Sequence, residues 1–221
     1  LRDRWPRRKA RRLLAALALA PGGVGMAELI DLLEETSEHA DAAVRTTVMS
    51  LRRVLEPELA RGERSRFVVA TGDGYGLAPD VRVDVQAFEG AIARARAALP
   101  ADLPAALAAY QDALASYRGN LLAEPGFVGF FEGRRRLLQV AALEALRFLH
   151  AHYTAAGETA AAEATLRRAI ELAPCEEDLY LALMRHLETA GQLERARQVY
   201  WDLRRALKAE LGLSPSPTFE A

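Results

Sequence analysis

Apolar residues recur at helical spacing in three segments of the first third of the chain. The segments run from Arg7 to Leu19, from about Met26 to Leu33, and from Asp41 to just before Pro57. In the third segment, steps of four, three and four residues place one apolar set on a single side of a helix: Val44, Val48, Leu51 and Leu55. The pattern therefore predicts three helices, of which the third is strongly amphipathic.

A short β-prone segment follows, with three glycines at alternate positions after it. Residues 67–71 (FVVAT) favour a strand, and Gly72-Asp73-Gly74 supplies residues that tolerate a positive φ in a tight turn. A phosphate-binding loop is the alternative, but it needs a different glycine spacing and a following helix, which Pro79 opposes. The pattern predicts a hairpin, and three helices before a hairpin is the order of a winged helix-turn-helix.

The rest of the chain, from Asp84 to Leu211, has helical periodicity interrupted by glycine and proline. Gly157 and Gly191 are 34 residues apart, and alanine and leucine positions around them keep the same offset. This is the period of tetratricopeptide repeats, which are pairs of antiparallel helices. An earlier copy of the small–large–small triplet predicts an insert at about residues 121–142. The expected fold is mainly α, a winged helix-turn-helix with a β-hairpin wing followed by a tetratricopeptide-like domain.

Composition narrows the function without naming it. The chain has 221 residues, 51% of them apolar, a net charge of −1 and one cysteine, Cys175. We expect no disulfide framework, no membrane segment and a cytoplasmic protein. His150 and His152 fall on different sides of a helix and cannot share a metal ion. With no catalytic constellation, we expect no enzyme activity, no cofactor and no metal.

The third predicted helix carries the candidate DNA-binding residues. Residues 1–66 hold 13 Lys and Arg against 10 Asp and Glu, so positive charge gathers in the first third. We expect base contacts from the polar side of this helix, at Thr46, Met49, Ser50 and Arg53. Phosphate contacts are expected from Arg45, Arg52, Arg66, Arg8 and Lys9, and wing contacts from Thr71, Gly72, Asp73 and Gly74.

Several segments resemble one family of regulators. They are AELIDLL (27–33), SLRRVLEP (50–57), GYGL (74–77), VDVQAFE (83–89) and ELGLSPSP (210–217). Together the chain resembles the Streptomyces antibiotic regulatory protein family, in which an OmpR-type winged helix precedes a bacterial transcriptional activator domain. The start, WPRRKARRLLAALAL, resembles versions found at an end of large ATPase-coupled regulators, so we expect a piece of a longer protein.

The resemblance implies a winged helix DNA-binding domain at residues 1–79 and a bacterial transcriptional activator domain at residues 80–221. It implies a sequence-specific transcriptional activator whose partners are double-stranded DNA and RNA polymerase, with a homodimer left open. The chain departs from the family pattern in three places. Only residues 1–6 remain for the β-sheet that usually precedes the first helix, Glu34-Glu35 replaces a Trp-Pro pair, and Asp73 stands at the wing tip.

These departures leave a second hypothesis open. An anionic wing tip repels phosphate, and the near-neutral net charge gives the chain no general attraction to DNA. The chain would then be a tetratricopeptide-type protein-interaction or autoinhibitory module of a larger regulator, and would not itself bind DNA.

Overall fold

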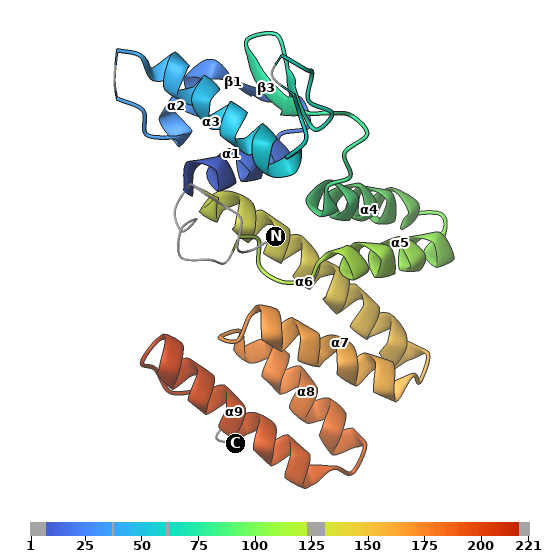
Figure 1. The fold of residues 1–221 in the computed structure, drawn as a ribbon. Coiled ribbons are helices and arrows are strands. Elements are labelled where there is room, and N and C mark those ends of the chain that lie inside the picture. Colours follow the sequence, from blue (N-terminus) through green and yellow to red (C-terminus); the bar gives the residue numbers. More distant parts are fainter. Residues whose placement is uncertain (1–7, 37, 61, 123–130, 217–221) are drawn as a thin grey trace. The chain divides into compact units, whose positions relative to one another are not determined.

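The computed structural model describes residues 8–36, 38–60, 62–122 and 131–216. These residues form two compact units, which are described separately below. The first lies within Leu1–Gly90 and Leu122–Gly133, and the second within Ala91–Leu121 and Arg134–Ala221. The predicted fold class is confirmed, because helices dominate both units and a small antiparallel sheet completes the first (Figure 1).

Three helices build the body of the first unit. They are α1 (Arg8–Leu19), α2 (Met26–Leu32) and α3 (Ala40–Leu55), within about two residues of the predicted ranges. Each helix turns its apolar stripe toward a shared core, because burial of that stripe stabilises short helices that are marginal in isolation. The fully buried core side chains include Leu13, Leu17, Leu29, Leu33, Val44 and Leu51.

The sheet of the first unit has three strands, not the two that the sequence predicted. The hairpin strands are β2 (Val68–Ala70) and β3 (Gly74–Leu77), and β1 (Val24–Gly25) pairs with the other edge of β3, giving the order β1-β3-β2. Both pairings are antiparallel. A strand of two residues has no alternation to detect, so hydropathy gave no signal for β1. The sheet expected before α1 falls on residues outside the described part of the chain.

The first turns of α4 (Asp84–Ala98) also belong to the first unit. Asp84 begins the helix and accepts a hydrogen bond from Val85 N–H at 2.8 Å. Gln86 Nε2 donates to the main-chain oxygen of Ala18 at 3.2 Å, where α1 is ending, and Phe88 is buried. The VDVQAFE segment therefore closes the carboxyl end of α1, which explains why polar and aromatic residues alternate there.

Antiparallel helices build the second unit, as the periodicity predicted. After α4 come α5 (Leu103–Ser116), α6 (Glu132–Ala155), α7 (Thr159–Leu172), α8 (Glu177–Thr189) and α9 (Leu193–Glu210). Helices α7, α8 and α9 lie side by side in Figure 1, and α8 packs against both neighbours. Small residues at the helix contacts are buried, including Ala106, Ala113, Ala162, Ala169 and Ala196.

The period of 34 residues is reproduced in backbone geometry. Gly157 and Gly191 follow the ends of α6 and α8 with φ of 74° and 71°. After each glycine, an N–H reaches back five residues with the same length: Glu158 to Tyr153 and Gln192 to Leu187, both 2.8 Å. Both turns are Schellman motifs, in which a left-handed glycine closes the helix.

The predicted insert differs from the structure in its second half. Residues 132–142 are the first three turns of α6 and continue without a break into its repeat portion, so they are not a separate element. The segment 123–130 lies outside the described residues.

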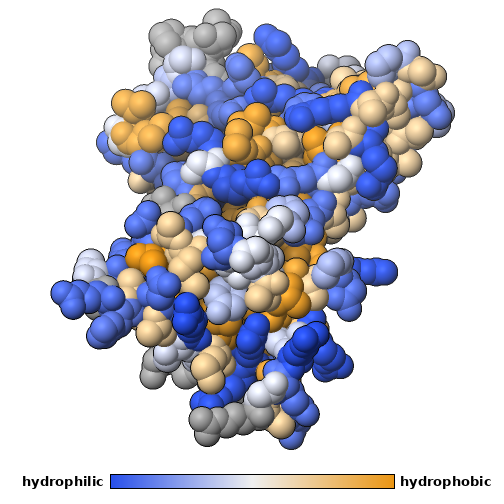
Figure 2. Space-filling view, turned by 90° about the horizontal axis from the view of Figure 1, so that it is seen from above, coloured by the Kyte–Doolittle hydropathy of each residue, from blue (hydrophilic) through white to orange (hydrophobic). Residues whose placement is uncertain are grey.

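Polar residues cover much of the surface. In the space-filling view, hydrophilic side chains dominate the visible face, and apolar side chains form patches between them (Figure 2). Within the described residues, no helix combines the length and the apolar character needed to cross a bilayer.

Candidate nucleic-acid interface

Helix α3 has one buried side and one exposed side. Val44, Val48 and Leu51 are at most 1% exposed, and Leu55 is half-buried near the end of the helix. On the opposite side Thr46, Met49 and Arg53 are exposed, and Ser50 is half-buried. The predicted division of this helix is thus present, and the side predicted to meet DNA is available to solvent.

The exposed side offers few groups that the protein already uses. Thr46 donates its hydroxyl proton to the Ala42 oxygen at 2.9 Å, so its lone pairs remain as acceptors. Met49 leaves 52% of its surface exposed, which is high for a large apolar side chain. Arg45 forms an exposed ion pair with Asp41 at 3.6 Å, and such surface pairs contribute little stability.

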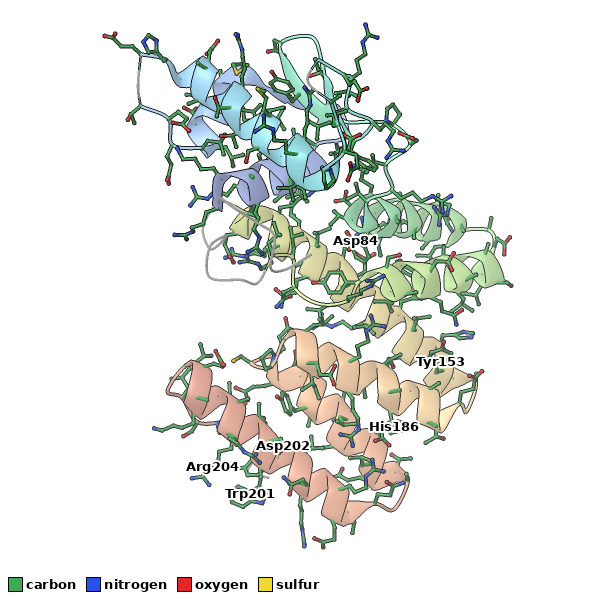
Figure 3. The ribbon with its side chains drawn as sticks, in the orientation of Figure 1. Asp84, Tyr153, His186, Trp201, Asp202 and Arg204 are labelled. Atoms are coloured by element: carbon green, nitrogen blue, oxygen red, sulfur yellow. The ribbon has the colours of Figure 1, made fainter. Side chains whose placement is uncertain are left out.

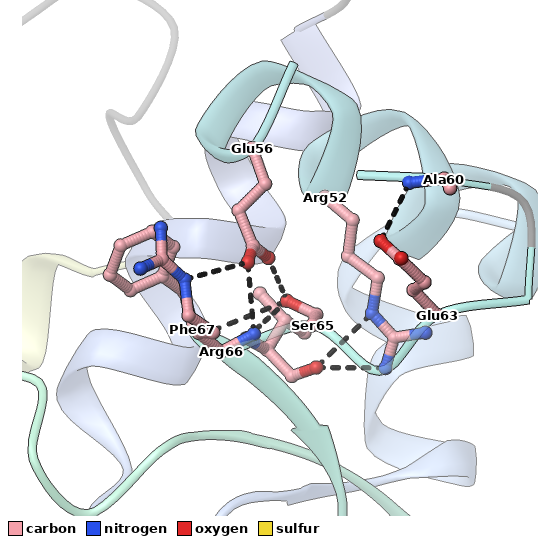
Figure 4. Close-up of polar contacts among 8 residues, drawn as sticks. Arg52, Glu56, Ala60, Glu63, Ser65, Arg66 and Phe67 are labelled. Atoms are coloured by element: carbon pink, nitrogen blue, oxygen red, sulfur yellow. Dashed lines mark hydrogen bonds and ion pairs between the residues drawn. The ribbon is translucent and has the colours of Figure 1, made fainter. Parts of the chain in front are cut away.

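Arg52 has a different environment from Arg53. Its Nε and Nη2 donate to the main-chain oxygen of Val68 in β2, at 3.1 and 2.8 Å, and its guanidinium lies 5.9 Å from the Tyr75 ring centre (Figure 4). These contacts join the end of α3 to both strands of the hairpin. Arg52 therefore fixes the wing relative to α3, a role that its sequence position did not reveal.

A second polar cluster joins the end of α3 to the segment before β2. Glu56 is 7% exposed and accepts hydrogen bonds from the Ser65 hydroxyl and from Arg66 N–H, the latter at 3.0 Å (Figure 4). The guanidinium of Arg66 adds an ion pair at 3.5 Å while its side chain stays 81% exposed. Burial alone would raise the pKa of Glu56, but the hydrogen bonds from Ser65 and Arg66 outweigh it, and the net pKa is lowered. The carboxylate thus stays ionised and orients Arg66.

The wing tip is a tight turn held by its own backbone. Thr71 and Gly74 exchange two hydrogen bonds, N to O at 3.0 and 3.3 Å, which leaves Gly72 and Asp73 as the two turn residues. The expected positive φ is not found at Gly72, Asp73 or Gly74. Gly74 instead accommodates β1, because a Cβ there would lie 1.9 Å from the Val24 oxygen.

Asp73 is turned toward its own protein. Its main-chain oxygen accepts from Met26 N–H at 3.1 Å, and its carboxylate oxygen lies 3.0 Å from the place where a Cβ on Gly25 would stand. The carboxylate therefore lies beside the start of α2, where the helix dipole favours a negative charge. The acidic wing tip has a structural reason that the sequence did not suggest.

The basic start of α1 is divided between solvent and protein. Arg8 is exposed, whereas Lys9 Nζ lies 2.6 Å from Glu35 Oε1 and Arg12 Nη1 lies 3.2 Å from Glu34 Oε2. Glu34 has a φ of 55°, in the left-handed turn that ends α2. Glu34-Glu35 therefore joins the end of α2 to α1 through two ion pairs.

Sequence reasoning missed Ser65, Glu56 and the internal role of Arg52. Pairing between residues 16 or 9 positions apart leaves no local periodicity. The signal available was Glu56 itself, a carboxylate between an apolar seam and Pro57, but nothing in the sequence identified its partner. Among the described residues, no group of three or more His, Cys, Asp or Glu side chains lies close enough together to hold a metal ion.

Helices, hairpin and repeat define a class: a winged helix-turn-helix unit joined to a tetratricopeptide-like unit, as in bacterial transcriptional regulators. Residues 83–221 match the family described as the bacterial transcriptional activator domain. The chain belongs to that family, and the resemblance to the Streptomyces antibiotic regulatory proteins is confirmed.

Two relatives come from Streptomyces coelicolor. The chain is 35% identical over 217 residues to the regulatory protein AfsR, covering 94% of this chain and 20% of AfsR. It is 28% identical over 211 residues to the transcriptional regulator RedD, covering 94% of this chain and 60% of RedD. The chain thus spans a fifth and three fifths of the lengths of these relatives.

A solved structure has the same architecture. Mycobacterium tuberculosis EmbR, determined in complex with a low-affinity phosphopeptide, matches with a TM-score of 0.65 and 26% identity. The match covers 97% of this chain and 57% of that of EmbR.

Proposed function

We propose that the chain is the DNA-binding and activating part of a transcriptional regulator, with α3 as its recognition helix. The observation that carries the proposal is the exposed Thr46, Met49 and Arg53 opposite a fully buried valine and leucine seam. In helix-turn-helix proteins the second helix of the motif enters the major groove and offers such a side to the base edges. Membership in a transcriptional activator family supports the same function.

Within this proposal the residues divide between reading and positioning. Arg53 reads a guanine or contacts phosphate, Thr46 and Ser50 accept or donate hydrogen bonds, and Met49 contacts a thymine methyl group. Arg45, Arg66 and Arg8 are exposed and neutralise phosphates. Lys9 and Arg52 hold the protein's own structure, and their contribution to DNA affinity is indirect.

The wing contributes through its backbone and Thr71 more than through charge. Asp73 is the one ionisable group among the four wing residues, and its carboxylate is turned toward the start of α2. This geometry weakens the main argument for the interaction-module alternative, which was repulsion between Asp73 and phosphate.

The second unit supplies the activating contacts in this proposal, either with RNA polymerase or with a second copy of the chain. Its last helix exposes Trp201 by 52%, and the following segment exposes Leu211 and Leu213 by 55% and 58%. Tetratricopeptide-like surfaces commonly bind partner proteins. These apolar side chains support a protein contact at this end of the unit.

The experiment begins with selection of DNA fragments from a random pool by this chain. Affinity for an enriched fragment is then compared between the wild type, Arg53→Ala and Arg197→Ala. Arg197 is a matched control, because it is an exposed arginine on α9 paired with Glu194. We expect Arg53→Ala to weaken binding about tenfold or more and Arg197→Ala to leave it unchanged. Equal affinities for all three proteins would refute the role of α3.

A further inference from the structure

The second unit contains an open pocket of about 490 Å³ between helices α6, α7 and α8. Two histidines, an arginine and three threonines line it together with small residues: His150, Thr154, Gly157, Thr159, Ala182, Arg185, His186, Thr189 and Ala190. No carboxylate is among these lining residues. The pocket therefore combines hydrogen-bonding groups, one fixed positive charge and an otherwise small, apolar wall.

The two histidines come from successive repeats and lie together. His150 on α6 and His186 on α8 have ring centres 6.3 Å apart, at an angle of 64° (Figure 3 labels His186). His150 Nδ1 lies 3.3 Å from the Ala162 oxygen, which orients the ring. The sequence had weighed His150 against His152, two residues away, but the structure gives it His186 as its neighbour.

His186 has an unsatisfied nitrogen. Its Nε2 is buried and has no hydrogen-bond partner among the described residues. A buried polar atom without a partner costs about 1–3 kcal/mol, so proteins rarely retain one without a reason. A small rotation of the ring toward the pocket would let a ligand oxygen satisfy it.

The start of α7 adds a second favourable feature. Thr159 is both the first residue of α7 and a lining residue of the pocket, and no side chain caps this helix. The N–H groups of a first helical turn lack partners within the helix and carry its positive dipole end. They face the same side of the pocket as the Thr159 side chain.

The charges around His150 point to the sign of the ligand. Burial lowers the pKa of His150, and the neighbouring His186 lowers it further, while the contact with Ala162 opposes both. The other groups at the pocket that carry or gain charge are Arg185 and His186, both on α8, and α7 contributes no titratable lining residue. All three groups at the pocket are therefore cationic or become so, and a bound anion relieves their mutual repulsion.

We propose that this pocket binds a small molecule through an anionic group, a carboxylate or a phosphate, carried on a compact apolar body. Arg185 supplies the fixed charge, His186 and the first turn of α7 donate hydrogen bonds, and Ala182 and Ala190 contact the apolar part. The site lies wholly within the second unit. It is independent of whether α3 binds DNA.

Nuclear magnetic resonance of the histidine rings tests the proposal directly, because the chain has four histidines. The whole chain is titrated with sodium benzoate, a carboxylate on an apolar ring, and separately with inorganic phosphate. Sodium chloride at equal ionic strength serves as the control. Each ring is assigned from its His→Gln variant. We expect saturable shifts at His150 and His186 with benzoate, phosphate or both, an upward shift of the His150 pKa at saturation, and no saturable shift at His39.

Two variants make the outcome specific. Arg185→Ala should weaken binding about tenfold, as expected for loss of a charge-assisted hydrogen bond, and Arg197→Ala should leave it unchanged. Binding of benzoate alone identifies the carboxylate form of the proposal, and binding of phosphate alone the phosphate form. The proposal is overturned if neither probe gives saturable shifts at His150 and His186, if all four rings shift alike, or if Arg185→Ala binds like the wild type.

Discussion

The guanidinium of Arg52 donates two hydrogen bonds to a single atom, the main-chain oxygen of Val68, at 3.1 and 2.8 Å. One side chain of the recognition helix therefore sets the position of β2. The next residue, Arg53, is exposed, and the structure gives it no hydrogen bond or ion pair within the described residues. Two adjacent arginines thus separate the stability of the winged helix from its proposed contact with DNA.

Replacing each arginine by alanine should separate these roles. Arg52→Ala leaves the Val68 oxygen without its donors and should lower the free energy of unfolding of the first unit by about 1–3 kcal/mol. Arg53→Ala should change it by less than about 0.5 kcal/mol, because exposed substitutions away from special contacts are nearly neutral. Hydrogen–deuterium exchange of peptides covering residues 66–78 measures both. Equal protection in the two variants would contradict the assignment.

The buried Glu56 should make the first unit sensitive to acid. Its folded pKa is lowered, so its contribution to stability is present above the unfolded pKa and is lost as pH falls toward the folded pKa. At neutral pH we expect Glu56→Gln to lower the free energy of unfolding by about 1–3 kcal/mol, because Ser65 and Arg66 N–H lose a charged acceptor. Between about pH 5 and pH 3 that difference should shrink.

Urea unfolding of the wild type and Glu56→Gln at several pH values checks this expectation. Glu58→Gln is the control, since Glu58 is an exposed carboxylate two residues away. A difference between wild type and Glu56→Gln that does not change with pH would show that the charge of Glu56 is not what stabilises the cluster.

Two glycines of the wing should respond oppositely to alanine. At Gly74 a Cβ would lie 1.9 Å from the Val24 oxygen, so Gly74→Ala must push β1 away from β3. We expect a loss of about 2–4 kcal/mol, typical of overpacking against backbone. At Gly72 a Cβ meets nothing within 4 Å, so Gly72→Ala should be nearly neutral. Thermal unfolding of the two variants compares them, and equal melting temperatures would rule out the packing explanation.

The repeat geometry predicts matched costs at Gly157 and Gly191. Both have a positive φ and the same turn hydrogen bonds, so alanine at either should cost about 1–2 kcal/mol from left-handed strain. Gly133, in the first turn of α6, has no positive φ and open space around it, so Gly133→Ala should stabilise the helix by about 0.5–1 kcal/mol. Chemical unfolding monitored by circular dichroism gives all three values. Clearly unequal costs at Gly157 and Gly191 would mean that the two turns are not equivalent.

Local patterns predicted most of the helices because amphipathic spacing and helix-ending glycines are short-range signals. The α3 seam from Val44 to Leu51 and the 34-residue offset of Gly157 and Gly191 are examples. The sequence did not predict features that depend on distant partners. Strand β1, the contact between Arg52 and Val68, and the neighbouring His150 and His186 join residues that share no local pattern.

The glycine spacing of GDGYG shows the same limit. The sequence suggested that the glycines serve the turn, and the turn exists. Gly74 is nevertheless required by the close approach of β1, a strand about 50 residues earlier that was not predicted. The same contact places Asp73 beside α2, which changes the meaning of an acidic residue at the wing tip.

The central claim is that α3 and its neighbouring arginines bind DNA, and the salt dependence of affinity for a selected DNA fragment tests it most directly. With about five phosphate contacts, the logarithm of the association constant should fall against the logarithm of salt concentration with a slope near −4.5. A slope near zero, or failure of the chain to enrich any fragment, would contradict the account.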